Sequence, residues 1–98
     1  MYIVREIVQC KPGKVREMVK KIKGLSSIME RQGYKPLRLL TDVSGEPFWT
    51  VTSDAEVSSL DDFAAMQDKV MADAEARQIM AGYHDLLVSG RREIFRVE

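Results

Sequence analysis

The order in which the hydrophobic residues change their spacing limits the fold of this chain more than any other feature. An alternating apolar run comes first, and a stripe with helical spacing follows it. Two further extended runs, a longer helical region and a last alternating run complete the chain. A spacing of two residues is typical of strands and a spacing near 3.6 is typical of helices. The sequence therefore predicts the order strand, helix, strand, strand, helical region, strand.

The first strand is predicted over residues 2–10, where both alternating sets of side chains are largely apolar. A strand that is apolar on both sides belongs in the middle of a sheet. Lys11-Pro12-Gly13 interrupts the alternation, because proline lacks the amide donor of a strand but suits the approach to a helix. We expect an amphipathic helix over residues 14–31, and Gly33 as a left-handed residue that terminates it.

Two extended runs, over residues 36–43 and 47–53, flank the short linker Ser44-Gly45-Glu46. A linker of this length and composition is typical of a hairpin, so the two strands should pair antiparallel. Aromatic and β-branched residues fill the second run, as expected for a strand.

The long helical region carries two signals for a helix start. Ser59 is followed three residues later by an acid, and Asp73 also precedes an apolar stripe. Both residue types are favoured at the N-cap, so the region is predicted to be two helices or one kinked helix. Gly90 is expected to end it, and the last strand is expected over residues 92–97.

This order of elements, βαββααβ, is the split βαβ pattern of a ferredoxin-like fold, an α+β domain with a four-stranded antiparallel sheet. The crossover helices should cover one face of the sheet, because such connections are right-handed. The other face then stays bare, although the first strand offers no clean polar face to water. We expect a second copy of the chain to cover it, giving a homodimeric α/β barrel.

Length and charge restrict the classes of partner. The 98 residues form a single domain over residues 1–98, and so small a core favours self-association. Fifteen basic and fifteen acidic residues cancel, so nucleic acid and anionic membranes are not expected partners. No apolar run reaches the roughly 18 residues of a membrane span. The charged N-terminus does not resemble a signal peptide, so a cytoplasmic protein is expected.

Three segments carry a family resemblance: Tyr2-Ile3-Val4-Arg5-Glu6, Lys11-Pro12-Gly13-Lys14 and Gly90-Arg91-Arg92-Glu93-Ile94-Phe95. With them the whole chain resembles the dimeric α/β-barrel superfamily, and within it the NIPSNAP-like and antibiotic-biosynthesis-monooxygenase-like small domains. The resemblance implies a small-molecule pocket between sheet and helices or in the barrel lumen, in some members without metal or cofactor. The haem-degrading branch uses an asparagine, a tryptophan and a histidine. This chain contains no asparagine, so that set does not carry over.

His84 is the only histidine, and an unperturbed imidazole is the only side chain that titrates near neutral pH. It is either a catalytic base at the mouth of a pocket or an ordinary residue near a helix end. Trp49 and Tyr83 are candidates to line an aromatic-binding pocket, and the alternative for both is core packing.

Four arginines, Arg5, Arg38, Arg92 and Arg96, lie on the predicted strands. If they share the face away from the helices, two subunits would place several guanidinium groups around one lumen and bind an anion there. The alternative is that neighbouring acids such as Glu6 neutralise them. A shift of one residue in register would reverse each face assignment.

One histidine and one cysteine leave only carboxylates as metal ligands, so no metal site and no cofactor are predicted. Cys10 ends an apolar strand and is expected to be a buried, inert thiol. Three functions remain open. The chain is expected to be a NIPSNAP-like binder of a small anionic or aromatic molecule, a cofactor-independent monooxygenase or isomerase of an aromatic or polyketide-like compound, or a non-catalytic dimerisation module. In the second case His84 would be the base and Arg5 would orient an anionic group.

Overall fold

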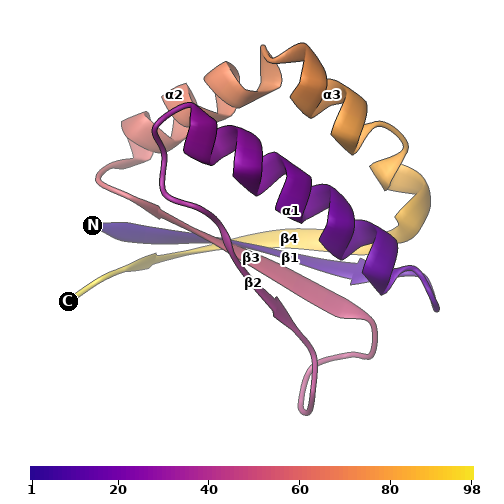
Figure 1. Cartoon of the computed structure of the whole chain (residues 1–98). Coiled ribbons are helices and arrows are strands. Elements are labelled where there is room, and N and C mark those ends of the chain that lie inside the picture. Colours follow the sequence, from indigo (N-terminus) through magenta and orange to yellow (C-terminus); the bar gives the residue numbers. More distant parts are fainter.

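A four-stranded antiparallel sheet in the order β2-β3-β1-β4 forms the base of the computed structural model, which describes residues 1–98 (Figure 1). Its strands are β1 (Tyr2–Cys10), β2 (Arg38–Thr41), β3 (Thr50–Val57) and β4 (Leu87–Arg96). The helices are α1 (Val15–Arg31), α2 (Leu60–Met71) and α3 (Ala74–Met80), and the 3-10 turn η1 (Tyr83–Leu86) follows them. All three helices lie on one face of the sheet, so the ferredoxin-like α+β prediction is confirmed.

The register assigns each strand residue to one of two faces, which we name the helix face and the open face. Val4 of β1 pairs with Ala55 of β3, and both are buried against the helices. Their neighbours Arg5 and Asp54 also pair and therefore lie on the open face. Since β1 has a partner strand on each side, it is the interior strand that its two apolar faces predict.

Two groups of buried side chains fill the space between the helix face and the helices. The first joins β1 and β3 to α1, α2 and α3, and it contains Val4, Ile28, Met29, Ala55, Val57, Phe63, Met66, Val70 and Ala76. The second lies at the other end of α1 and contains Cys10, Met18, Val19, Ile22, Val51 and Leu86. Because the buried side chains form two separate groups, space remains between the groups on the helix face.

The predicted starts of α2 and α3 and the predicted turn after α1 are confirmed. The Ser59 hydroxyl accepts the backbone N–H of Asp62 at 3.1 Å, so α2 begins where the capping signal predicts. The Asp73 carboxylate accepts the N–H groups of Glu75 and Ala76 and starts a separate helix, α3. After α1 the chain turns at Gly33, whose φ of 92° is the left-handed conformation expected of a terminator.

The predicted strand over residues 47–53 is wrong at its start, because the segment before Thr50 is a turn. Trp49 has a φ of 68°, which is in the left-handed region and outside the extended range of regular strand residues. Two hydrogen bonds hold the turn closed: the Thr50 hydroxyl donates to the Pro47 carbonyl, and the Thr50 N–H donates to the Asp42 carboxylate. Strand propensity at Trp49 is therefore overridden, and β3 continues instead to Val57.

The expectation that Gly90 ends the helical region is also wrong. Gly90 lies within β4 opposite Val8, and a Cβ there would be 3.5 Å from a Val8 methyl group. The helical region ends earlier, at Leu86, after Gly82 has turned the chain with a φ of 79°. Pairing with β1 extends β4 from Leu87, so tertiary contacts decide this boundary.

The ends of the chain lie side by side, and the N–H of Val97 donates to the carbonyl of Met1 (Figure 1). None of the helices combines the length and the apolar character needed to cross a bilayer.

Candidate functional site

A cleft lies on the helix face of the sheet, under α1 and α2. It consists of two adjoining hollows of about 150 and 300 Å³. The hollows share six lining residues: Glu6, Leu25, Leu37, Ser53, Gln67 and Met71. Because so many residues are common to both, we treat the hollows as one elongated site and name it the cleft.

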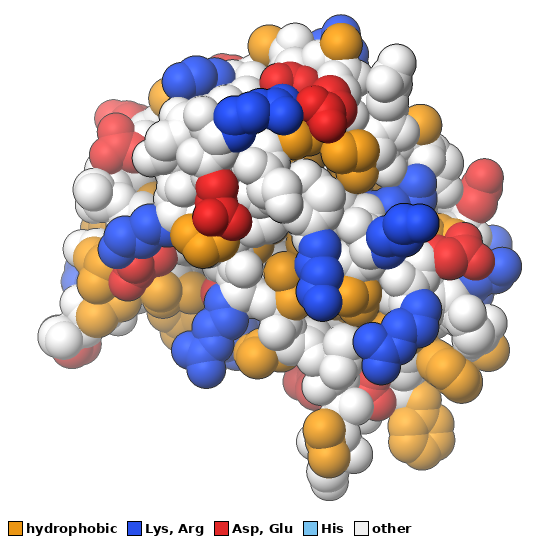
Figure 2. Space-filling model, viewed as in Figure 1, with side chains coloured by type: hydrophobic (Ala, Val, Ile, Leu, Met, Phe, Trp, Pro, Cys, Tyr) orange, Lys and Arg blue, Asp and Glu red, His pale blue; other side chains and the backbone are white.

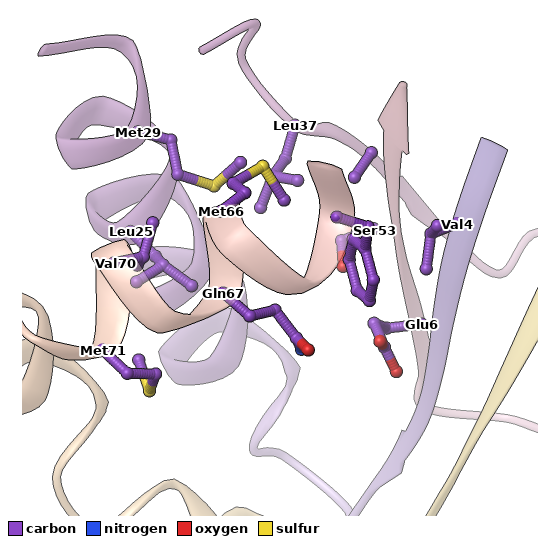
Figure 3. A pocket seen from close by; sticks show the side chains of 12 residues that line it. Val4, Glu6, Leu25, Met29, Leu37, Ser53, Met66, Gln67, Val70 and Met71 are labelled. Carbon is purple, nitrogen blue, oxygen red and sulfur yellow. The ribbon is translucent and has the colours of Figure 1, made fainter. Parts of the chain in front are cut away.

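Methionine dominates the walls of the cleft. Five of the six methionines of the chain line it: Met18, Met29, Met66, Met71 and Met80. Methionine side chains are unbranched and polarizable, so they adapt to ligands of different shape. Figure 3 shows Met29, Met66, Val70 and Met71 turned toward this space from α1 and α2.

Glu6 and Arg92 are the only charged residues that line the cleft, and they form an ion pair. Arg92 Nε lies 2.5 Å from Glu6 Oε1. The Arg92 guanidinium also lies over the ring of Phe63, 5.0 Å from its centroid, and so links β4 to α2. The positive and negative charges cancel within the site.

Gln67 and Ser53 complete the polar part of the cleft. Figure 3 shows the Gln67 amide, from α2, and the Glu6 carboxylate, from β1, extending into the same space. Ser53 lies opposite Glu6 in the β1–β3 register, so their side chains share the helix face. These groups offer hydrogen bonds inside an otherwise apolar site, which is the usual composition of a small-molecule pocket.

The two predicted aromatic lining residues lie in different places. Tyr83 lines the larger hollow of the cleft, at the η1 end. Trp49 lines a separate surface depression beside Phe48 and Arg16, and 42% of its surface is exposed. The structure therefore does not bring Trp49 and Tyr83 together in one pocket.

His84 is exposed in η1, and its ring centroid lies 3.9 Å from that of Tyr83. It lines neither hollow of the cleft. The catalytic role of His84 stays a prediction.

The four arginines do not share one face of the sheet. Arg5 and Arg38 each lie opposite Asp54 and therefore occupy the open face. Arg92 pairs with Glu6 on the helix face, and Arg96 lies on that face over the Tyr2 ring. The shared-lumen arrangement is thus wrong, because the odd and even positions of β4 point to opposite faces and the register selects between them.

The sequence reasoning missed Glu6 and Gln67 as site residues. Glu6 alternates with Val4 and Val8 in the first strand, so an acid sits within an apolar set. That interruption was the available signal. Gln67 offered no such signal in the sequence, because a polar residue on a helix is ordinarily exposed.

Cys10 lies outside the cleft, and it is buried as predicted. Burial raises the pKa of its thiol, because charge is unfavourable in an apolar environment. The thiolate that reacts or binds metals is therefore disfavoured.

The face seen in Figure 2 mixes basic and acidic side chains, and hydrophobic side chains are also exposed along its lower edge. The loop between β2 and β3 projects there, and Val43 and Phe48 on it are 97% and 79% exposed. This loop extends beyond the sheet on the side away from the helices (Figure 1).

No protein-family model and no curated protein matches the chain. Solved structures do match. A NIPSNAP family protein of unknown function from Agrobacterium tumefaciens superposes with a TM-score of 0.82 at 19% identity, over 99% of this chain and 87% of that one. An uncharacterised NIPSNAP domain protein from Burkholderia xenovorans gives 0.82 at 19% identity, over 100% and 95% of the two chains.

An antibiotic-biosynthesis-monooxygenase-like protein from Nitrosomonas europaea is similar over 99% of this chain and 98% of its own, with a TM-score of 0.75 at 13% identity. At such low identity the shared property is the arrangement of the backbone. The chain therefore has the ferredoxin-like fold of the NIPSNAP-like and antibiotic-biosynthesis-monooxygenase-like small domains.

Proposed function

We propose that this domain binds a small, largely apolar molecule in the cleft between its sheet and its helices. The observation that carries the proposal is the cleft itself, in which apolar walls surround a few convergent polar groups. A soluble domain normally fills such a space with side chains, since protein interiors are close-packed. An unfilled apolar space with hydrogen-bonding groups is the composition that ligand sites share.

Charge favours a neutral ligand over an anionic one. Arg5 is occupied by Asp54 on the open face, and Arg92 is occupied by Glu6 in the cleft. No unpaired guanidinium therefore faces the cleft to attract a carboxylate. An aromatic or aliphatic body suits the methionine-rich walls.

The same proposal includes a homodimer formed through the open face. Leu40 and Phe95 on this face are 38% and 49% exposed, and the loop with Val43 and Phe48 projects beside it. Covering these side chains with the open face of a second copy would bury the apolar surface that one layer of helices leaves bare. The ligand sites would then lie outside the dimer interface, one under the helices of each subunit.

The ligand proposal is tested with diphenylmethane, a neutral hydrocarbon, titrated into isotope-labelled protein and followed by amide NMR shifts. We expect saturable shifts at cleft residues such as Ser53 and Gln67. The variant Gln67→Trp fills the shared part of the cleft from an exposed helix position and should weaken binding roughly tenfold or more. Asp68→Trp, at the next exposed position, is the matched control and should bind as the wild type does. Shifts confined to the open face, or equal binding by both variants, would refute the ligand site.

The dimer is tested separately by size-exclusion chromatography with light scattering at micromolar concentration. Phe95→Glu should give a monomer, because it places a charge on the open face. Ile94→Glu is the control, since Ile94 is similarly exposed, at 47%, but faces the helices. A wild-type monomer, or equal dissociation of both variants, would contradict the interface.

A further inference from the structure

Three polar groups lie in the middle of the cleft, between an apolar end and an end that also holds Tyr83 and Arg92. Glu6, Ser53 and Gln67 belong to the part that the two hollows share. Beyond them, the smaller hollow is closed by apolar residues only: Val4, Met29, Ala55, Phe63, Met66 and Val70. The larger hollow continues along Val8, Met18, Ile22, Val51 and Met80 to Tyr83 and Arg92.

One oxygen of the Glu6 carboxylate, which lines both hollows, makes no hydrogen bond within the protein. Glu6 Oε1 accepts the Nε of Arg92, and this is the one hydrogen bond that its carboxylate makes in the protein. Each carboxylate oxygen can accept more than one hydrogen bond, so Oε2 is open to a donor. A hydrogen bond to a charged acceptor is stronger than one between neutral groups.

The residues around Glu6 disfavour a ligand that carries a charge next to its carboxylate. An anionic ligand would meet the Glu6 carboxylate, and the compensating guanidinium is already engaged. A cationic ligand would have to leave water for a methionine-lined space that carries no net charge, which is costly. A neutral donor such as a hydroxyl group satisfies Glu6 without either cost.

We infer that the cleft selects neutral molecules in which two apolar arms flank a central hydroxyl or other hydrogen-bond donor, and that Glu6 Oε2 accepts this donor. The inference rests on the proposed ligand site and specifies its substrate class. Glu6 is thus the residue that determines specificity, while the methionines accommodate the arms. A ligand with its donor at the end that enters the smaller hollow would place that donor among apolar side chains, where it has no acceptor.

The test compares three molecules of similar shape: diphenylmethanol with a central hydroxyl, diphenylmethane without one, and diphenylacetate with a central anion. Dissociation constants come from the same NMR titration. We expect diphenylmethanol to bind about tenfold more tightly than diphenylmethane, and diphenylacetate to bind more weakly than either. Glu6→Leu, which removes the acceptor, should abolish the preference for the alcohol, so that the dissociation constants of alcohol and hydrocarbon become equal.

Two further variants keep the result interpretable. Glu6→Gln preserves the shape and a neutral acceptor, so it should retain an intermediate preference even if Glu6→Leu folds poorly. Glu93→Gln makes the same change on the open face, and it should bind all three molecules as the wild type does. Equal affinity for alcohol and hydrocarbon would overturn the inference and leave the ligand site standing. Failure of both to bind would remove the proposed function together with the inference.

Discussion

Arg5 and Asp54 lie directly opposite each other on β1 and β3 and form two parallel hydrogen bonds, from Nε to Oδ1 at 2.8 Å and from Nη2 to Oδ2 at 2.9 Å. Asp54 is 11% exposed and Arg5 is 34% exposed, so the pair lies partly buried on the open face. The hydrogen bond to Asp54 is the main cause that raises the pKa of the guanidinium. This fork geometry fixes the relative position of the two interior strands.

The interaction between Arg5 and Asp54 should therefore add to the free energy of unfolding beyond what each side chain contributes separately. A double-mutant cycle of Arg5→Ala and Asp54→Ala is expected to give a coupling free energy of about 1 kcal/mol in urea unfolding. The same cycle on Lys35 and Glu56, a more exposed pair that joins the loop before β2 to β3, is the control and should give less. Equal coupling in the two cycles would show that the two-bond geometry of Arg5 adds nothing.

Gly24 in the middle of α1 allows the close approach of α3. A Cβ at position 24 would lie 3.1 Å from Cγ2 of Ile79, which is tighter than an ordinary contact. Gly24→Ala gains about 1 kcal/mol of helix propensity but must displace Ile79, so we expect the free energy of unfolding to change little. Gly24→Val is β-branched and larger, and it should lower that free energy by about 1–3 kcal/mol.

Chemical denaturation of both Gly24 variants measures these effects. The matched control is Ile79→Ala combined with Gly24→Val, because removing the obstructing side chain should recover part of the loss. If the two substitutions changed the free energy of unfolding additively, contact with Ile79 would not be the reason for glycine at position 24.

Asp73 makes the stability of α3 depend on pH. The hydrogen bond from the Ala76 N–H is the main cause that lowers the pKa of its carboxyl group below the ordinary 3.8. A group whose pKa falls on folding stabilises the protein above its unfolded pKa, and this contribution is lost as the pH drops through the folded value. Asp73→Ala should therefore lower the melting midpoint at pH 7, and the difference from wild type should narrow below pH 3.8.

Thermal unfolding over a series of acidic pH values measures this difference. Asp73→Asn retains a capping oxygen and should keep most of the midpoint at pH 7, since asparagine is as good an N-cap as aspartate. If the difference in melting midpoint between wild type and Asp73→Ala stayed constant through the acid range, this would contradict the role of the charged carboxylate.

Much of the fold could be predicted from local patterns alone. The alternating run of β1, the amphipathic stripe of α1 and the caps at Ser59 and Asp73 each depend on neighbouring residues, and each is confirmed. The turn that ends at Trp49 could not be predicted, because an aromatic residue favours strands. Hydrogen bonds of Thr50 with Asp42 and Pro47, and of the Cys10 N–H with the Trp49 carbonyl, hold the turn instead.

Less of the candidate site could be predicted from the sequence. Of its residues, Tyr83 and Arg92 were predicted candidates, although Arg92 was expected on the face away from the helices, whereas Glu6 and Gln67 were not predicted. Their side chains come from β1 and α2, which are distant in the chain, and no local pattern indicates that two such residues meet over one hollow.

The sequence by itself determined the order and type of the helices and strands and how their apolar sides are spaced, because these properties follow from propensity and period. The tertiary structure alone decided which face each arginine occupies. A strand alternates its side chains, so the register between β1 and β4 places Arg92 beside Glu6 in the cleft and leaves Arg5 with Asp54 on the open face. That register depends on contacts between residues 86 positions apart in the chain, and no local pattern contains it.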